Sequence, residues 1–260
     1  MQAQDLLHRF RLDDRVALVT GASSGLGRHF AQVLAAVGAH VLLAARRVEK
    51  LRDVVAEIEA AGGRAQALSL DVTSSASVRA CFEQAAKMAG VPDILVNNAG
   101  VTITKPLLRH TEEDWDSVLD TNLKGAWLVA TEAARGMVEA GKAGSIVNIG
   151  SILGLRVAGG VAPYSISKAG LAQATKSMAL ELARHGIRVN ALLPGYVVTD
   201  FNRHFLASDG GEKLRSRIPT RRFGELSDLD GPLLLLASDA GRHMSGSCLV
   251  VDGAHSVNSL

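Results

Sequence analysis

The chain has 260 residues, of which 47% are hydrophobic and 21% charged, and its net charge is +2. This composition is typical of a globular protein and excludes disordered and collagen-like chains. The near-neutral charge and an aromatic content of 4% argue against a nucleic-acid partner. No apolar run reaches the ~18 residues of a membrane-spanning helix, and the polar N-terminus does not resemble a secretory signal. We therefore expect a cytoplasmic protein with no membrane partner.

Short runs rich in Val, Ile and Leu alternate with longer helical patterns along the chain. The predicted strands are Val16–Thr20, Val41–Ala45, Ala65–Leu70, Ile94–Asn97, Ser145–Ile149, Arg188–Leu192 and Leu249–Val251. The predicted helices cover residues 25–37, 49–61, 75–89, 112–138, 163–184 and 227–238. These strands show little polar alternation, as a parallel sheet buried on both faces requires. The pattern predicts an α/β fold with about seven strands, a Rossmann-like, doubly wound parallel sheet with helices on both faces.

No linker or change in composition divides the sequence, so we expect one domain over residues 1–260. Residues 1–13 are expected to form a loose N-terminal tail. Residues 199–224 have no strand signal and separate the sixth strand from the seventh. A long connection of this kind is often a binding loop, so we predict a substrate lid there.

A glycine-rich loop joins the first strand to the first long helix. Its glycines allow a tight turn and a close approach of the backbone to a pyrophosphate, which the helix N-terminus attracts. The position after the first strand is typical of a dinucleotide site. The predicted contacts in this loop are Gly21, Ser23, Ser24, Gly25, Leu26 and Gly27.

The end of the second strand predicts which nicotinamide cofactor is used. An acid there would bind the ribose 2′-hydroxyl, whereas an arginine would accommodate a 2′-phosphate. The sequence has Arg46 and Arg47 and no acid. This favours NADP(H) and leaves NAD(H) open, since the two arginines could also be a solvated surface pair.

Tyr164 and Lys168 stand four residues apart in a helical pattern and therefore share one helix face. A free phenol has a pKa near ~10, and a neighbouring ammonium lowers that pKa by stabilising the phenolate. Such a phenol could exchange a proton with an alcohol or carbonyl oxygen. Ser151 follows the fifth strand, where a hydroxyl faces the ligand crevice of an open α/β sheet and could bind the substrate oxygen.

These motifs resemble the short-chain dehydrogenase/reductase family, in its single-domain branch of about this length with a Tyr-x-x-x-Lys motif, from Arg15 to Gly253. The resemblance implies hydride transfer between a nicotinamide cofactor and an alcohol or carbonyl compound, without a metal. It implies that Tyr164 is the acid–base group, that Lys168 binds the ribose and lowers the pKa of Tyr164, and that Ser151 positions the substrate oxygen. Asn122 matches a catalytic Asn that supports a proton-relay water.

The same resemblance implies further cofactor contacts and an assembly. The matching residues are Asp71, Val72, Asn98, Ala99, Gly100, Pro194, Gly195, Val197 and Thr199. Two positions depart from the family pattern: Ser24 stands where NADP-dependent members often have a basic residue, and Ala254 stands where a second Gly is frequent. A homotetramer is also implied, packed through the long helices at 112–138 and 163–184 and the last strand.

Three functions remain open from the sequence. The first is an oxidoreductase acting on a small or medium-sized ketone or secondary alcohol. The second is a 3-oxoacyl-thioester reductase, which is favoured only by a basic cluster that could bind an acidic carrier and consists of Arg215, Arg217, Arg221 and Arg222. The third is a nicotinamide-binding protein without catalysis, against which the intact Asn122, Ser151, Tyr164 and Lys168 argue.

Overall fold

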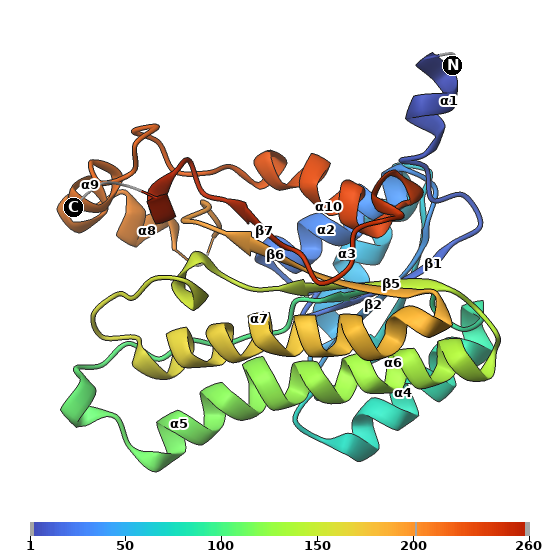
Figure 1. The fold of residues 1–260 in the computed structure, drawn as a ribbon, viewed down its shortest axis with the longest axis horizontal. Helices are drawn as coiled ribbons and strands as arrows, with labels where there is room; N and C mark the ends of the chain where they lie inside the picture. Colours follow the sequence, from blue (N-terminus) through green and yellow to red (C-terminus); the bar gives the residue numbers. More distant parts are fainter. Residues whose placement is uncertain (1–2, 201, 258–260) are drawn as a thin grey trace.

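A computed structural model describes residues 3–200 and 202–257, and it contains a seven-stranded parallel sheet of order β3-β2-β1-β4-β5-β6-β7 (Figure 1). Every predicted strand is present, and the bounds differ from the predictions by two residues at most. The strands are β1 Val16–Thr20, β2 His40–Ala45, β3 Arg64–Ser69, β4 Ile94–Asn97, β5 Gly144–Ile149, β6 Ile187–Pro194 and β7 Cys248–Val251. The prediction of a doubly wound α/β fold is confirmed.

Helices cover both faces of this sheet (Figure 1). One core lies between the sheet and α2, α3 and α10, and it includes Phe30, Leu51 and Leu233. The other core lies between the sheet and α4, α6 and α7, and it includes Phe82 and Val129. The helices are α1 Ala3–His8, α2 Gly25–Ala36, α3 Val48–Ala60, α4 Ser75–Ala89, α5 Glu112–Leu119, α6 Ala126–Glu139, α7 Ala162–Leu182, α8 Arg203–Leu206, α9 Asp209–Arg215 and α10 Asp230–Ala237.

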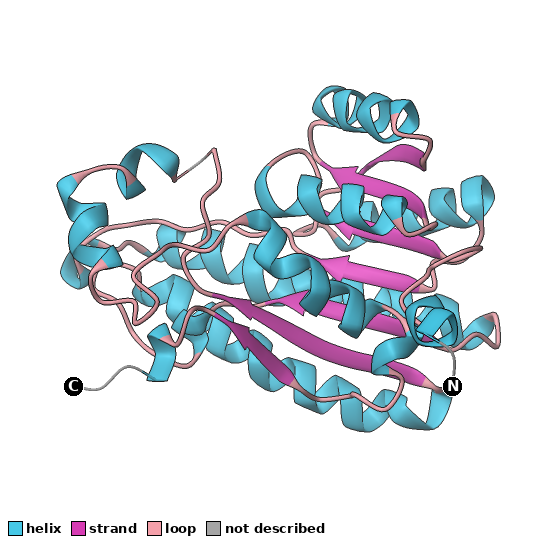
Figure 2. Cartoon of the chain, turned by 90° about the horizontal axis from the view of Figure 1, so that it is seen from above, coloured by secondary structure: helices cyan, strands magenta, loops and turns pink. Residues whose placement is uncertain are grey.

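The strand order reverses between β1 and β4, and this reversal locates the ligand crevice. Val19 of β1 pairs with Leu43 of β2 on one side and with Val96 of β4 on the other. The crossover connections leave these strands in opposite directions, which opens a crevice at their carboxyl ends. Figure 2 shows the strand arrows ending at one side of the molecule, where the long loops lie.

The helix predicted over residues 112–138 is interrupted. The structure has α5, then a wider π-helical turn over Asp120–Gly125 (η2), and then α6. Hydrophobic periodicity does not register such a turn, because the apolar face continues on both sides of it. Turns of this type often occur at functional sites, and this one carries Asn122.

Two loops differ from their predicted character. Residues 3–8 of the expected loose tail form α1, and Leu12 is 2% exposed because it packs in the core beneath α2, with its N–H bonded to the Val37 carbonyl oxygen. The expected lid at 199–224 contains α8 and α9, and its Phe201 lies outside the described residues, as do residues 1–2 of the tail. None of the helices in the described ranges has both the length and the hydropathy to cross a membrane.

Candidate active site

The glycine loop after β1 is built so that its backbone lies open at the N-terminus of α2. Gly21 and Gly25 have φ of 64° and 53°, in the left-handed region that disfavours a side chain. A Cβ at Gly27 would lie 2.5 Å from Asn98 Nδ2 and still closer to the Gly21 carbonyl oxygen. Ser24 occupies the N-cap position, but its side chain does not cap the helix. The first N–H groups of α2 therefore remain available to an anion.

Thr20 holds this loop against the end of β4. Its buried hydroxyl accepts hydrogen bonds from the backbone N–H groups of Asn98 (2.9 Å) and Ala99 (3.0 Å). Asn98 returns a bond from Nδ2 to the Thr20 carbonyl oxygen at 2.9 Å. The predicted loop residues and the predicted Asn98–Gly100 segment thus meet at one place. Ser23 and Leu26 complete the loop and are half-buried.

The end of β2 presents two exposed arginines, Arg46 and Arg47, beside the end of β3. The pKa of Asp71 is lowered, mainly by hydrogen bonds from Thr73 and to a smaller extent by the charge of Arg46. Asp71 Oδ1 accepts from the Thr73 N–H at 3.0 Å and from its hydroxyl at 2.8 Å. Val72 is buried. An exposed guanidinium near this edge could pair with a 2′-phosphate, so the loop, the helix N-terminus and Arg46 fit a dinucleotide.

Tyr164 and Lys168 lie on α7, and the ammonium is 5.7 Å from the centre of the phenol ring. Lys168 Nζ donates a hydrogen bond of 2.7 Å to the carbonyl oxygen of Ile149, the last residue of β5. Ser151 follows two residues later, and its Oγ accepts a hydrogen bond from the Leu153 N–H at 3.1 Å. The structure therefore brings these three predicted residues together at the carboxyl end of β5.

Burial dominates the acid–base properties of this pair. Burial raises the pKa of Tyr164, and hydrogen bonding with the Ser151 hydroxyl acts in the opposite direction. Burial also lowers the pKa of Lys168 to about 8. Spacing alone predicts that the ammonium lowers the pKa of Tyr164, and this is not what the structure shows. The spacing gives the proximity of the two groups but not the loss of solvent around them.

Asn122 joins the π-helical turn to both neighbours of the site. Its Oδ1 accepts from the Val101 N–H at 2.8 Å, and its Nδ2 donates to the Val101 carbonyl oxygen at 2.8 Å and to Ser167 Oγ at 3.1 Å. Ser167 Oγ in turn donates to the Tyr164 carbonyl oxygen at 2.7 Å. A Cβ at Gly100 would lie 3.3 Å from Asn122 Oδ1 and 3.7 Å from Lys168 Nζ, so Gly100 leaves this corner open.

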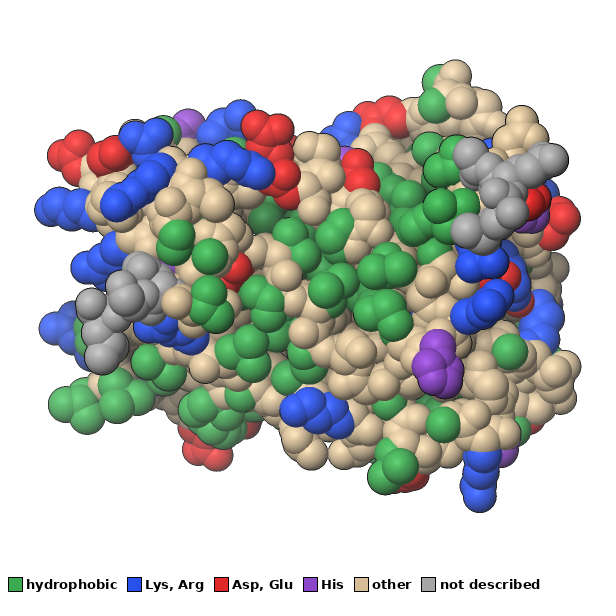
Figure 3. Space-filling model, turned by 45° about the horizontal axis from the view of Figure 1, so that its top comes forward, with side chains coloured by type: hydrophobic (Ala, Val, Ile, Leu, Met, Phe, Trp, Pro, Cys, Tyr) green, Lys and Arg blue, Asp and Glu red, His purple; other side chains and the backbone are tan. Residues whose placement is uncertain are grey.

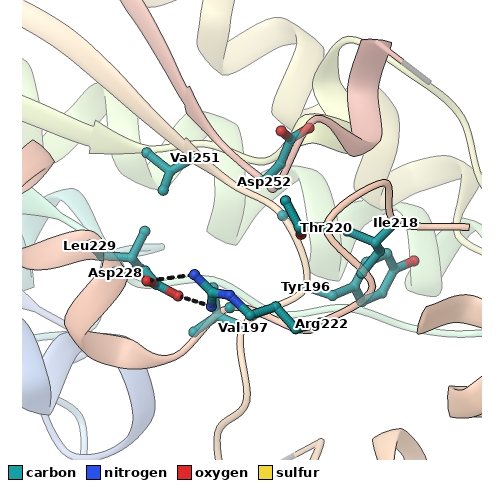
Figure 4. A pocket seen from close by; sticks show the side chains of 12 residues that line it. Tyr196, Val197, Ile218, Thr220, Arg222, Asp228, Leu229, Val251 and Asp252 are labelled. Atoms are coloured by element: carbon teal, nitrogen blue, oxygen red, sulfur yellow. Dashed lines mark hydrogen bonds and ion pairs between the residues drawn. The ribbon is translucent and has the colours of Figure 1, made fainter. Parts of the chain in front are cut away.

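The segment after β6 closes the other side of the crevice. Pro194 ends β6, and the next residues lie beside a pocket of about 140 Å³ between the ends of β6 and β7 (Figure 4). Gly195 and Val197 line this pocket. Thr199 lies across the crevice from the glycine loop, because a Cβ at Gly25 would be 3.9 Å from its Cγ2. The cofactor-site residues predicted from β1 and from β6 therefore face each other.

Three residues of this site were not among those predicted from the sequence. Thr20 and Ser167 form the hydrogen bonds described above, and both are fully buried. Tyr196 lines the pocket and is close enough to Tyr164 to contribute to the raised pKa of that phenol. A signal existed for Tyr196, since an aromatic residue directly follows Pro194-Gly195. A buried hydroxyl such as Ser167 has no signature before its neighbours in space are known.

Comparison with known proteins agrees with this geometry. Residues 15–209 match the short chain dehydrogenase family. The chain is 39% identical to a 3-oxoacyl-(acyl-carrier-protein) reductase of Staphylococcus aureus, over 91% of this chain and 96% of that protein. It is 34% identical to a 2-dehydro-3-deoxy-D-gluconate 5-dehydrogenase of Escherichia coli, over 95% of this chain and 98% of that protein.

A similar solved structure is a gluconate 5-dehydrogenase of Burkholderia cenocepacia, in complex with NADP and tartrate. The two chains superpose with a TM-score of 0.93 at 36% identity, over 97% of this chain and 99% of that one. The fold, the match over most of the chain and these identities lead to one conclusion: the chain belongs to the short-chain dehydrogenase family and is an oxidoreductase.

Proposed function

We propose that this protein is an NADP(H)-dependent oxidoreductase that interconverts a ketone and a secondary alcohol. The observation that carries the proposal is the meeting of Ser151, Tyr164 and Lys168 beside the glycine loop, at the carboxyl ends of the central strands. The bound cofactor would supply or accept the hydride. Protein side chains would then have to bind the substrate oxygen and exchange its proton.

The side chains divide this work by their chemistry. The Ser151 hydroxyl would bind the substrate oxygen, and Tyr164 Oη would donate a proton to that oxygen during reduction. Lys168 would bind the cofactor ribose, and its charge would stabilise the phenolate left behind. Asn122 fixes the start of α7 through Ser167 and would support a water that returns the proton.

Two observations support NADP(H) over NAD(H). Arg46 is exposed at the end of β2, where an acid would be needed to bind a ribose 2′-hydroxyl. The similar gluconate 5-dehydrogenase structure was determined with NADP. The glycine loop and the N-terminus of α2 would hold the pyrophosphate, with Thr199 on the opposite wall.

The test is the loss of NADPH absorbance with a panel of ketones, in the wild type and in Tyr164→Phe. Loss of general acid catalysis should lower kcat at least about a hundredfold. Thermal unfolding of the variant should stay close to that of the wild type, since the ring remains. Full turnover by Tyr164→Phe would refute the assignment of the acid–base group.

A 3-oxoacyl-thioester reductase is the second candidate, and the Staphylococcus aureus relative favours it. The basic cluster argues for it less than the sequence suggests. Lys and Arg side chains do gather at the end of the molecule that carries α8 and α9, but acidic side chains lie among them (Figure 3). Arg215 pairs with Glu212 at 2.6 Å, and Arg222 pairs with Asp228 at 2.5 Å. Activity on acetoacetyl thioesters well above that on free ketones would establish this alternative.

A homotetramer in the cytoplasm is the third part of the proposal. Apolar side chains remain exposed on α6 and α7, including Trp127 (49%) and Leu180 (81%). Leu119, Leu123 and Trp127 also line a groove of about 330 Å³. Burial of such a surface by a second copy would be favourable. Light scattering measures the mass directly, and a monomer would refute the assembly.

A further inference from the structure

A line of side chains leads from the proposed reacting phenol to the C-terminal segment. Tyr196 directly follows Gly195, and its phenol is close enough to Tyr164 to contribute to the raised pKa of that residue. The Tyr196 ring in turn lies 5.8 Å from the ring of His255, tilted by 39°. His255 opens a short helical turn, η7 (His255–Val257), just after β7. The far end of the substrate crevice is therefore bounded by His255.

Two arginines approach His255 from different parts of the chain. Arg156 follows Ser151 by five residues, and its Nη1 donates a hydrogen bond of 3.0 Å to the Ser256 carbonyl oxygen. Arg217 lies between α9 and β7. Burial is the main cause that lowers the pKa of His255, and the charges of both Arg156 and Arg217 lower it further. Both guanidiniums are thus near the imidazole ring, and both residues are exposed.

Only one acid acts on His255 in the opposite sense, among the described residues. Asp252 raises the pKa of His255, but its Oδ2 already accepts a hydrogen bond of 2.6 Å from the Ser256 N–H. The surroundings of His255 therefore hold two guanidiniums against one carboxylate. Arg222, which also borders the pocket, differs because both of its terminal nitrogens bond to Asp228 (Figure 4). The excess positive charge belongs to Arg156 and Arg217.

We propose that Arg156 and Arg217, with His255 and Tyr196 beside them, form a subsite for a carboxylate at the non-reacting end of the substrate. The proposal rests on the proposed ketone and alcohol chemistry and names its substrate class as keto acids and hydroxy acids. A guanidinium presents donors in a planar fork that matches a carboxylate, and the neutral imidazole and the phenol add hydrogen-bond donors. One end of the substrate would then be held here while its carbonyl reaches Ser151 and Tyr164.

The experiment compares a series of keto acids of increasing chain length with the amides of the same acids, using NADPH and the full chain. The wild type should reduce the acid of the best-fitting length with a KM at least about tenfold below that of its amide, because a charge-assisted hydrogen bond is lost with the carboxylate. Arg156→Gln and Arg217→Gln should each raise KM for the acid about tenfold and leave kcat within about threefold. Both variants should leave kcat/KM for the amide unchanged.

Two further variants separate charge from structure. Arg156→Lys should recover part of the preference for the acid, because the positive charge returns without the fork. Arg184→Gln is the matched control, since Arg184 is an exposed arginine just before β6, at the opposite end of the sheet. It should not change KM for either substrate. Inhibition by keto-acid analogues that lack the carbonyl should weaken in Arg156→Gln to the same extent as KM rises.

The outcomes separate this inference from the proposed function. Equal KM values for acid and amide in the wild type would overturn the carboxylate subsite and leave the ketone reductase standing. An acid preference that survives both arginine substitutions would also overturn it. If no carbonyl compound of any charge is reduced, the proposed function itself is wrong.

Discussion

Replacement of Lys168 by Met should make the cofactor-free protein more stable while it abolishes activity. Lys168 is buried on α7, and burial lowers its pKa from 10.5 to about 8. That difference corresponds to about 3 kcal/mol that the folded state loses by holding the ammonium away from water. Met removes this loss but also removes the hydrogen bond to the Ile149 carbonyl oxygen, which contributes about 1 kcal/mol. The net gain expected near neutral pH is about 2 kcal/mol.

The pH dependence gives this prediction a sign that a packing effect would not have. Below a pH of about 8, Lys168 is protonated in both states, and the full loss applies to the wild type. Between about 8 and 10.5 the folded state is neutral while the unfolded state is still charged, so the loss declines as the pH rises. Above 10.5 both states are neutral. The advantage of Lys168→Met should therefore shrink across this interval and reverse at its upper end.

Urea unfolding of both proteins, followed by the fluorescence of Trp115 and Trp127, measures the difference in free energy of unfolding at each pH. Lys50→Met is the matched control, because Lys50 is exposed on α3 and should change stability by less than about 0.5 kcal/mol at every pH. A Lys168→Met protein that is less stable than the wild type near neutral pH would refute the reasoning. So would a gain that does not vary with pH.

Three further substitutions test the cofactor site. Thr20→Val removes the buried acceptor of two backbone N–H groups after β4, and should lower the free energy of unfolding by about 2–4 kcal/mol in urea titrations. Gly27→Ala places a methyl group against Gly21 and Asn98, and should weaken NADPH binding at least about tenfold in a fluorescence titration. Arg46→Asp should raise KM for NADPH about tenfold and change KM for NADH little. Equal effects on both cofactors would contradict the role assigned to this arginine.

The fold could be predicted because both faces of the sheet are buried. Val16–Thr20 is buried along its whole length, so a run of apolar β-branched residues is a sufficient signal for such a strand. The interruption at Asp120–Gly125 could not be predicted, since an apolar stripe continues from Val118 to Val129 on either side of it. Its cause lies in Val101 and Ser167, which are distant in the sequence.

The candidate site was predicted where its residues stand at a fixed spacing or at the end of a strand. Tyr164 and Lys168 are examples of the first kind, and Ser151 and Asn98 are examples of the second. The pKa values were not predictable, because they depend on how much water the folded chain removes from each group. His255 illustrates the same limit: nothing in the C-terminal sequence indicates that it lies beside Tyr196.

The π-helical turn over Asp120–Gly125 also constrains the length of the chain. Each residue of an α-helix rotates the next by about 100°, so a deletion within this turn would rotate everything that follows relative to α5. The buried face of α6, with Val129 and Met137, would then point away from the sheet. A deletion that tightened the turn would also move Asn122 from its bonds with Val101. Insertions and deletions should therefore be tolerated at the exposed loop tips and rejected here, where one residue affects both the packing of α6 and the corner of the active site.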